Sequence, residues 1–359
     1  MLNKIKSQKI LKTIFSKLRK KITVRLIKHN KNLLNKLNIV EKDFNEVIIF
    51  NYLKKKFWLD LRSIDIKVLN LTLLSLFDDI FDCLTYLEFK EVLEVKMLCN
   101  DITDIEFLSR MKMEKLKILT IEHNAIKDLN GLINSNFKEL KKLQLCMNTI
   151  INIEALEKVN YPKLVILDLS HNNIIDINTL EKVNFPELKK LDLKWNKIVD
   201  ITALGKAKFD QLEILDLNYN KFSDISALEN GSFKELKYLD LSENKIEDIN
   251  VLEKVKFNKL EILNLNRNNI YDIRVFERVY LNELKDLNLS ENKIEDINVL
   301  EKANFNKLEI LNLSVNLITD INIIKNFKFN KLKQLDIRWN KISEEDFKYF
   351  AELYGYIKN

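Results

Sequence analysis

One asparagine recurs every 24 residues through most of this 359-residue chain, without a single slip in spacing. The surrounding phrase is L-x-x-L-x-L-x-x-N-x-I, as in LVILDLSHNNI around Asn172. The eleven copies of the asparagine are Asn100, Asn124, Asn148, Asn172, Asn196, Asn220, Asn244, Asn268, Asn292, Asn316 and Asn340. A fixed period of about 20–50 residues is typical of units that stack on their own copies, because one unit cannot bury its hydrophobic face alone. Residues 92–342 are therefore predicted to form an elongated solenoid.

The unit around Asn172 shows why each copy should fold in the same way. Leu167 and Leu169 flank Asp168 in a two-residue alternation, which predicts a short strand with one buried face. Asn172 follows where the chain leaves that strand, and its amide can bond backbone groups that the turn leaves unpaired. Stacked units would align these amides in an asparagine ladder, and the loss of one such buried partner costs about 1–3 kcal/mol.

Two further side chains recur in register with the ladder. An aspartate four residues after the asparagine is expected to cap a short helix or turn on the convex side. It occurs as Asp104, Asp128, Asp176, Asp200, Asp224, Asp248, Asp272, Asp296 and Asp320. An aromatic residue eleven positions before the asparagine is expected to form a stripe in the core. It occurs as Phe137, Tyr161, Phe185, Phe209, Phe233, Phe257, Phe305 and Phe329.

These phrases, and the N-x-I-x-D-I-x-x-L half above all, resemble leucine-rich repeats of the intracellular and internalin-like kind. The resemblance implies an α/β solenoid, a horseshoe of about eleven 24-residue repeats. It also implies a non-catalytic protein that recognises a protein partner along its concave face. On this basis residues 1–38 are assigned to a helical segment, 39–91 to a helical N-terminal cap, 92–342 to the repeats and 343–359 to a C-terminal cap helix.

The outward positions of the predicted strands nominate a partner-binding surface. Four residues before the asparagine, aspartates recur through the middle of the array and are expected to form a solvated acidic stripe. One residue before it stand aromatic residues and an arginine, which are common interface anchors. The predicted set is Asp168, Asp192, Trp195, Asp216, Tyr219, Asp240, Arg267 and Trp339. The alternative is that the exposed Trp and Tyr only cover neighbouring side chains.

A super-period of 48 residues is superimposed on the repeat. Six residues before the asparagine, isoleucine occupies alternate units as Ile118, Ile166, Ile214, Ile262 and Ile310. The segments Ser242–Leu265 and Ser290–Leu313 differ at two positions only. Recent duplication of a pair of repeats would leave this pattern.

Catalytic and metal-binding patterns are missing from the sequence. The three histidines, His29, His123 and His171, are scattered, and no phosphate-binding loop, nucleophile elbow or zinc-protease motif occurs. No cofactor, metal site or enzymatic activity is therefore predicted. The odd count of three cysteines without a C-x-x-C pair, together with the absence of a signal-peptide pattern, favours the cytoplasm or the nucleus. No apolar run approaches the roughly 20 residues that span a bilayer.

The N-terminal segment differs from the rest in charge. Residues 1–60 hold sixteen Lys and Arg against four acidic residues, whereas the remainder is net acidic. Residues 1–38 show the spacing of two amphipathic helices. Part of this segment, SQKILKTIFSKLRKKITVRLIKHNKNLLNKL, resembles an F-box, the motif that docks on the Skp adaptor of cullin-type ubiquitin ligases. The resemblance implies adaptor contacts through Ile10, Ile14, Phe15, Leu18 and Leu26.

Three other interpretations of the N-terminal segment remain open. It has the basic, acid-free composition of a mitochondrial presequence, although it is rich in Lys rather than in Arg and Ser. A basic amphipathic helix can also lie on an anionic membrane or touch nucleic acid. The plainest interpretation is a cap on the first repeat. Two hypotheses follow: an adaptor that recruits a ubiquitin ligase, or a stand-alone scaffold whose helices are only a cap. No nucleic-acid partner is expected for the repeats.

Overall fold

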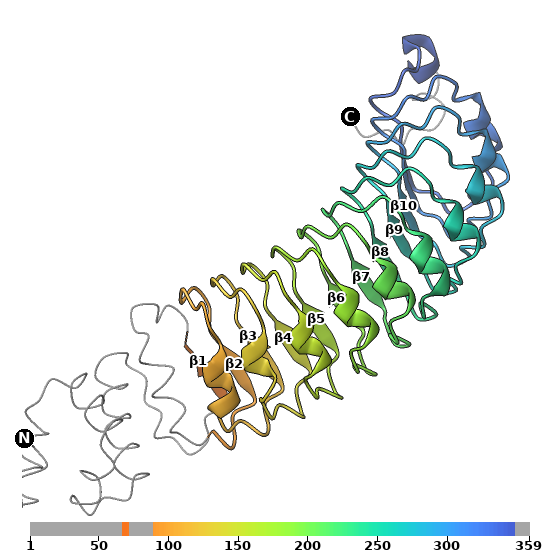
Figure 1. The fold of residues 1–359 in the computed structure, drawn as a ribbon. Helices are drawn as coiled ribbons and strands as arrows, with labels where there is room; N and C mark the ends of the chain where they lie inside the picture. The colour runs from red at the N-terminus through yellow and green to blue at the C-terminus, as the bar shows by residue number, and fades with distance from the viewer. Residues whose placement is uncertain (1–66, 72–88, 349–359) are drawn as a thin grey trace, which may run out of the picture.

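The chain forms a curved, stacked array of short strands and 3-10 turns (Figure 1). This computed structural model describes residues 67–71 and 89–348. The F-box-like segment, with Ile10, Ile14, Phe15, Leu18 and Leu26, lies outside the described residues, as does most of the predicted N-terminal cap. Within the described part of the chain, no helix has the length and apolar character that crossing a bilayer requires.

Twelve parallel strands of three residues each form one sheet in chain order. They are β1 (Val68–Asn70), β2 (Glu94–Lys96), β3 (Ile118–Thr120), β4 (Lys142–Gln144), β5 (Ile166–Asp168), β6 (Lys190–Asp192), β7 (Ile214–Asp216), β8 (Tyr238–Asp240), β9 (Ile262–Asn264), β10 (Asp286–Asn288), β11 (Ile310–Asn312) and β12 (Gln334–Asp336). From β2 onward each residue pairs with the residue 24 positions later, as Asp168 does with Asp192. The strict sequence period therefore fixes the register.

The sheet has one strand more than the eleven that the asparagine count predicts. The additional strand is β1, which pairs with β2 through Val68 and Glu94. These two partners lie 26 residues apart rather than 24, so β1 is out of phase with the later copies. Leu69 and Leu71 are nevertheless buried in the same core. The strand covers the edge that β2 would otherwise leave open.

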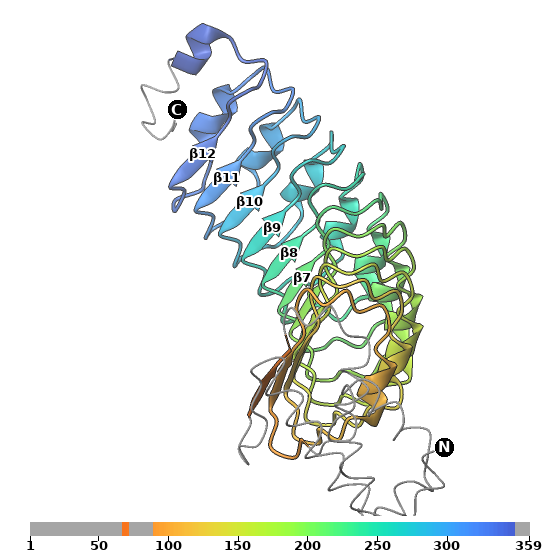
Figure 2. The same cartoon turned by 90° about the vertical axis from the view of Figure 1, so that its left-hand side faces the viewer.

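The return path of each unit carries a 3-10 segment on the convex side, as the view in Figure 2 shows. These segments are η2 (Glu106–Arg110), η3 (Asn130–Leu132), η4 (Glu154–Glu157), η5 (Asn178–Glu181), η6 (Thr202–Gly205), η7 (Ser226–Asn230), η8 (Asn250–Glu253), η9 (Arg274–Glu277), η10 (Asn298–Glu301) and η11 (Asn322–Asn326). The predicted aspartate caps are confirmed. Asp200, for example, accepts the backbone N–H of Thr202 at 2.7 Å. The capped elements are 3-10 segments rather than α-helices.

One continuous hydrophobic core fills the space between the sheet and the 3-10 segments. The aromatic stripe lies inside it, since Phe137 and Tyr161 have no exposed surface and Phe329 is only 6% exposed. The asparagine ladder is also present. The side-chain nitrogen of Asn220 donates to the carbonyl of Leu217 at 3.0 Å in its own unit and to that of Leu193 at 3.1 Å in the preceding one. Both sequence predictions about the core are confirmed.

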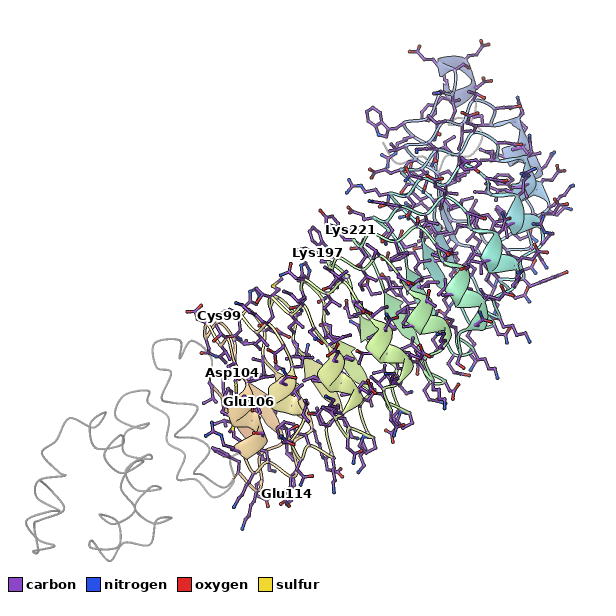
Figure 3. All side chains as sticks on the ribbon, viewed as in Figure 1. Cys99, Asp104, Glu106, Glu114, Lys197 and Lys221 are labelled. Carbon is purple, nitrogen blue, oxygen red and sulfur yellow. The ribbon has the colours of Figure 1, made fainter. Side chains whose placement is uncertain are left out.

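Two opposite edges bound the array, and Figure 3 labels residues on both. Cys99, Lys197 and Lys221 lie along the edge at which the chain leaves the strands, which we call the loop edge. Glu114 lies along the other edge, at which the chain returns to them. At the C-terminus, residues 344–348 form a helical turn. Ser343 begins that turn, because its hydroxyl accepts the backbone N–H of Asp346 at 3.1 Å.

Candidate functional site

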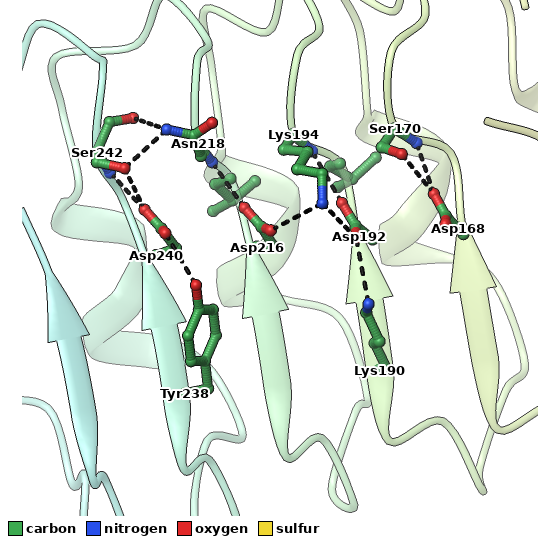
Figure 4. Close-up of polar contacts among 12 residues, drawn as sticks. Asp168, Ser170, Lys190, Asp192, Lys194, Asp216, Asn218, Tyr238, Asp240 and Ser242 are labelled. Atoms are coloured by element: carbon green, nitrogen blue, oxygen red, sulfur yellow. Dashed lines mark hydrogen bonds and ion pairs between the residues drawn. The ribbon is translucent and has the colours of Figure 1, made fainter. Parts of the chain in front are cut away.

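A polar row of four aspartates crosses the middle of the sheet at the carboxyl ends of β5 to β8 (Figure 4). Its members are Asp168, Asp192, Asp216 and Asp240. Each accepts the backbone N–H two residues later, from Ser170 at 3.0 Å, Lys194 at 3.4 Å, Asn218 at 3.1 Å and Ser242 at 2.9 Å, respectively. Asn264 makes the same contact with Asn266 at 3.1 Å. The position therefore needs a side-chain oxygen that closes the turn, which both Asp and Asn supply.

The expectation that this polar row is a solvated acidic stripe is wrong for three of its members. Asp192 is 1% exposed, Asp216 9% and Asp240 7%. Lys194 lies between two of them, with its ammonium nitrogen 3.4 Å from Asp192 and 3.6 Å from Asp216. These aspartates are buried because parallel strands lie about 4.8 Å apart. At that spacing a long side chain from one unit covers the carboxylate of the next.

Further contacts hold Asp192 and Asp240 in place. Lys190 reaches Asp192 at 3.3 Å from within the same strand. Tyr238 donates its hydroxyl to Asp240 at 3.0 Å, and Asn264 donates to the same carboxylate at 3.0 Å. These groups form one connected polar network on the concave face. The network fixes side-chain positions there more firmly than a free acidic surface would.

The electrostatics of the polar row are set by burial and by the neighbouring aspartates. Burial, with added repulsion from Asp192 and Asp240, raises the pKa of Asp216 to about 6. Burial alone would lower the pKa of Lys194, but Asp192 and Asp216 raise it overall. Asp216 therefore takes up a proton closer to neutral pH than an ordinary aspartate does.

A stack of three rings stands on the loop edge beside the polar row. Trp195 lies between His171, with ring centroids 5.2 Å apart, and Tyr219, with centroids 3.7 Å apart. The planes differ by 12° and 7°, so the rings are nearly parallel. The sequence predicted Trp195 and Tyr219 as neighbours on this surface. His171 was not among the predicted partner-binding residues, although it stands at the same position, one residue before Asn172.

The backbone beneath these rings has the left-handed conformation. Trp195 and Tyr219 both have a φ of 54°, and His171 has a φ of 52°. The residue before the ladder asparagine has a positive φ in every one of the eleven copies. This conformation favours Gly and Asn, and it costs a bulky residue about 1–3 kcal/mol. The geometry turns each of these side chains outward at the loop edge.

Two of the predicted partner-binding residues lie apart from this stack. Arg267 stands two units beyond Tyr219 and forms ion pairs with Glu243 at 3.0 Å and with Glu291 at 2.7 Å. Trp339 stands near the C-terminal end of the array and is 80% exposed. The eight predicted residues therefore occupy four places: the polar row, the ring stack, and two separate positions on the loop edge.

The described residues offer no arrangement suited to metal binding, since no three His, Cys, Asp or Glu side chains among them converge on one point. Burial, followed by the nearby carboxylates of Asp168 and Glu122, raises the pKa of the Cys146 thiol to about 12. A thiol with so high a pKa is not a nucleophile near neutral pH. Burial lowers the pKa of His171, so its imidazole is neutral at the same pH.

Comparison with known proteins agrees with this architecture. A family model described as leucine rich repeats in two copies matches residues 210–254, and one described as a single leucine rich repeat matches residues 162–176. No curated protein sequence matches the chain at a significant level. The Arabidopsis receptor kinase HAESA, solved in complex with the peptide hormone IDA and the co-receptor SERK1, is 21% identical with a TM-score of 0.55 over 70% of this chain and 42% of that one. At that identity the likeness concerns the fold alone.

A nearer likeness is to an internalin, InlF of Listeria monocytogenes. It is 30% identical over 76% of this chain and 73% of that one, with a TM-score of 0.63. This similarity in three dimensions agrees with the resemblance of the sequence to leucine-rich repeats. With its ladder of asparagines, its parallel sheet and this relative, the chain belongs to the leucine-rich repeat family.

Proposed function

We propose that this protein is a non-catalytic scaffold that binds a partner protein on its concave face. The observation that carries the proposal is an outward row six residues before each ladder asparagine. Ile166, Ile214 and Ile262 are half-buried there, and they alternate with Lys190 and Tyr238. Within the described chain no segment lies over this face of β7 to β12, which Figure 2 views directly.

The physical case rests on preorganisation. The concave side chains sit on strands whose register is fixed along the whole sheet, and the polar row beside them is held by its own hydrogen bonds. A surface ordered before binding loses less conformational entropy when a partner docks. Alternating isoleucines supply apolar contact, and Tyr238 adds an aromatic anchor of the kind enriched at interface hot spots. HAESA, which shares the fold, was solved with a peptide hormone and a protein co-receptor, so ligands of this class are compatible with the architecture.

Site-specific photo-crosslinking in cells tests the proposal. A photoreactive phenylalanine analogue replaces Tyr238 on the concave face or, as the matched control, Tyr280, which follows η9 and is 75% exposed. We expect the probe at Tyr238 to yield a discrete adduct with a partner protein and the probe at Tyr280 to yield none. Adducts of equal intensity at both positions, or none at Tyr238, would overturn the concave-face proposal.

The finer hypothesis of a ubiquitin-ligase adaptor is part of the same proposal. Its support is the sequence resemblance of Ile10, Ile14, Phe15, Leu18 and Leu26 to an F-box. The stand-alone scaffold, whose N-terminal helices are only a cap, is the competing form. Location in the cytoplasm or nucleus is supported by two cysteines that form no disulfide among the described residues, Cys99 and Cys146. In both hypotheses, the adaptor and the stand-alone scaffold, the partner protein binds to the repeats.

A further inference from the structure

Exposed apolar side chains gather on one stretch of the loop edge. The structure describes eleven large hydrophobic residues that are exposed, and six of them lie in the four units from Asn148 to Asn220. We call these six the loop-edge patch: Met147, Ile151, Ile175, Trp195, Val199 and Tyr219. Their exposed fractions run from 39% to 57%. Clustering of this kind is unusual, because single exposed apolar residues are normally scattered over a surface.

The loop-edge patch is built by an extended segment that repeats in each unit. After β6, Trp195, Lys197 and Val199 are exposed, whereas the intervening Asn196 and Ile198 are buried. Neighbouring units repeat this alternation 24 residues later with exposed or half-buried side chains, so the outward positions form three parallel rows along the edge. One row holds the stacked rings, and the third holds Ile151, Ile175 and Val199. The middle row holds Thr149 and Asn173, followed by Lys197, Lys221 and Lys245. The labelled Lys197 and Lys221 mark the middle row in Figure 3.

The ring row presents edges rather than faces. His171 and Tyr219 lie against the two faces of Trp195, at centroid distances of 5.2 Å and 3.7 Å. Trp195 therefore has no free face on which a nucleobase could stack, as single-stranded nucleic acid requires. Aromatic edges carry partial positive charge, and those of Trp and Tyr also carry hydrogen-bond donors. Such a row favours a partner with carboxylates.

The lysines of the middle row also favour a partner with negative charge. Lys197, Lys221 and Lys245 are exposed, and none forms an ion pair with another described residue. Many lysines elsewhere are paired; Lys189 and Lys237, for example, both contact Glu213 at 2.7 Å. The aspartates that follow the third row are already bonded to the backbone of the 3-10 segments, as Asp200 is to Thr202. Those aspartates keep their negative charge, but none of them forms an ion pair with Lys197, Lys221 or Lys245. Among the described residues, three ammonium groups without a carboxylate partner therefore lie along the middle of the loop edge.

From these observations, we propose that the loop-edge patch is a docking site for an acidic segment of a partner protein that also carries aliphatic side chains. The aliphatic groups would pack on the row of Ile151, Ile175 and Val199, and the carboxylates would meet Lys197, Lys221 and the ring edges. The proposal rests on the proposed role as a protein-binding scaffold. It adds a second contact surface, beside the concave face rather than on it.

The test uses the full chain and a random peptide library displayed on phage. The variant Trp195→Asn/Tyr219→Asn removes two rings and keeps the fold, since Asn tolerates a positive φ better than either aromatic residue. Trp339→Asn is the matched control, because Trp339 has the same position in its unit and a φ of 59° but lies outside the patch. Tyr238→Ser removes an anchor from the concave face.

Enriched peptides are expected to be acidic and to contain Leu, Ile or Val. Their affinity should fall roughly tenfold or more in the Trp195→Asn/Tyr219→Asn variant and stay unchanged in Trp339→Asn. Peptides that lose affinity only in Tyr238→Ser would overturn the loop-edge proposal and leave the concave-face function standing. A library that enriches no peptide would count against both. The remaining outcome is that polyuridylate binds more tightly than any peptide and loses affinity in the same double variant. That outcome would overturn the acidic-segment proposal and identify nucleic acid as the partner of the loop-edge patch.

Discussion

The side-chain oxygen of Asn220 accepts the backbone N–H of Ile198 across the boundary between two units, at 3.0 Å. The nitrogen of the same amide donates to the carbonyl of Leu193 across that boundary. One buried side chain thus closes its own turn and bonds to the preceding unit on either side of Asn196, where that unit turns. An insertion between two units would separate these partners, which accounts for the unbroken 24-residue spacing of the asparagines.

Replacement of Asn220 by Ala should lower the free energy of unfolding by about 1–3 kcal/mol, because it leaves buried backbone groups unpaired. Asn244→Ala is the matched control. The side-chain oxygen of Asn244 has no hydrogen-bond partner among the described residues. Asn244→Ala therefore breaks one hydrogen bond fewer than Asn220→Ala and should lower the free energy of unfolding by ~1 kcal/mol less. Denaturant midpoints of the two variants measure the difference. Equal midpoints would contradict the role of the inter-unit bond to Ile198.

Much of this fold was predictable because it repeats. The asparagine ladder, the aspartate caps and the buried aromatic stripe each recur at one fixed offset, so a single unit explains all of them. β1 escaped prediction because its 26-residue offset from β2 breaks that phase. The burial of Asp192 escaped prediction for a different reason. Sequence alone shows a carboxylate at an outward position, but it does not show that Lys190 and Lys194 fold over it.

A charge alternation with the same 48-residue period runs from Lys189 to Lys333. Glu213, on the edge at which the chain returns to the sheet, contacts Lys189 in the preceding unit and Lys237 in the following one, each at 2.7 Å. Charges of opposite sign alternate between neighbouring units here, so the same sign returns only after two units. These exposed pairs contribute little stability individually. If a unit stacked on the unit two positions away instead of on its neighbour, side chains of like charge would meet at this position. The alternation therefore favours stacking between neighbouring units.

A pH dependence follows from Asp216, whose pKa is raised from 3.8 to about 6 in the folded protein. The folded state binds more protons than the unfolded state between these values. The stability from this group is therefore complete below the lower value and is lost as pH rises through the upper one, by at most about 3 kcal/mol. Asp216→Asn should be more stable than the wild type at neutral pH. The difference should shrink as pH is lowered to about 4.

Asp336→Asn provides a control of opposite sign at the same position in its unit. Burial alone would raise the pKa of Asp336, but hydrogen bonds from Arg338 leave it lowered. Its carboxylate therefore stabilises the folded state above its ordinary pKa, and that stability is lost as pH falls through the folded value. The variant should be less stable than the wild type at neutral pH. Unfolding free energies measured across the pH range distinguish the two; stabilisation by both substitutions would show that charge is not the cause.

Two convex segments approach each other so closely at Gly205 that no larger residue should be tolerated there. A Cβ atom on Gly205, the last residue of η6, would lie 2.4 Å from the carbonyl oxygen of Ala227 in η7. Because the obstacle is backbone, Gly205→Ala must displace one segment and should cost about 1–3 kcal/mol. Glu229→Ala alters the same position in the next unit, where the side chain is exposed, and should change stability by less than about 0.5 kcal/mol. Thermal unfolding of the two variants compares them directly; equal melting points would show that η6 and η7 move apart freely.

The choice between ubiquitin-ligase adaptor and plain scaffold depends on the apolar face that contains Phe15 and Leu18. If this face is an F-box, Phe15→Asp/Leu18→Asp should abolish recovery of the Skp adaptor in a pull-down while the repeats keep their melting behaviour. If the face is a cap, the same charges enter a core and should lower stability by several kcal/mol. The two outcomes separate because one changes binding and the other changes folding. We expect the first. Failure of the wild-type protein to recover any adaptor from cells of its own species would end the ligase hypothesis and leave the scaffold.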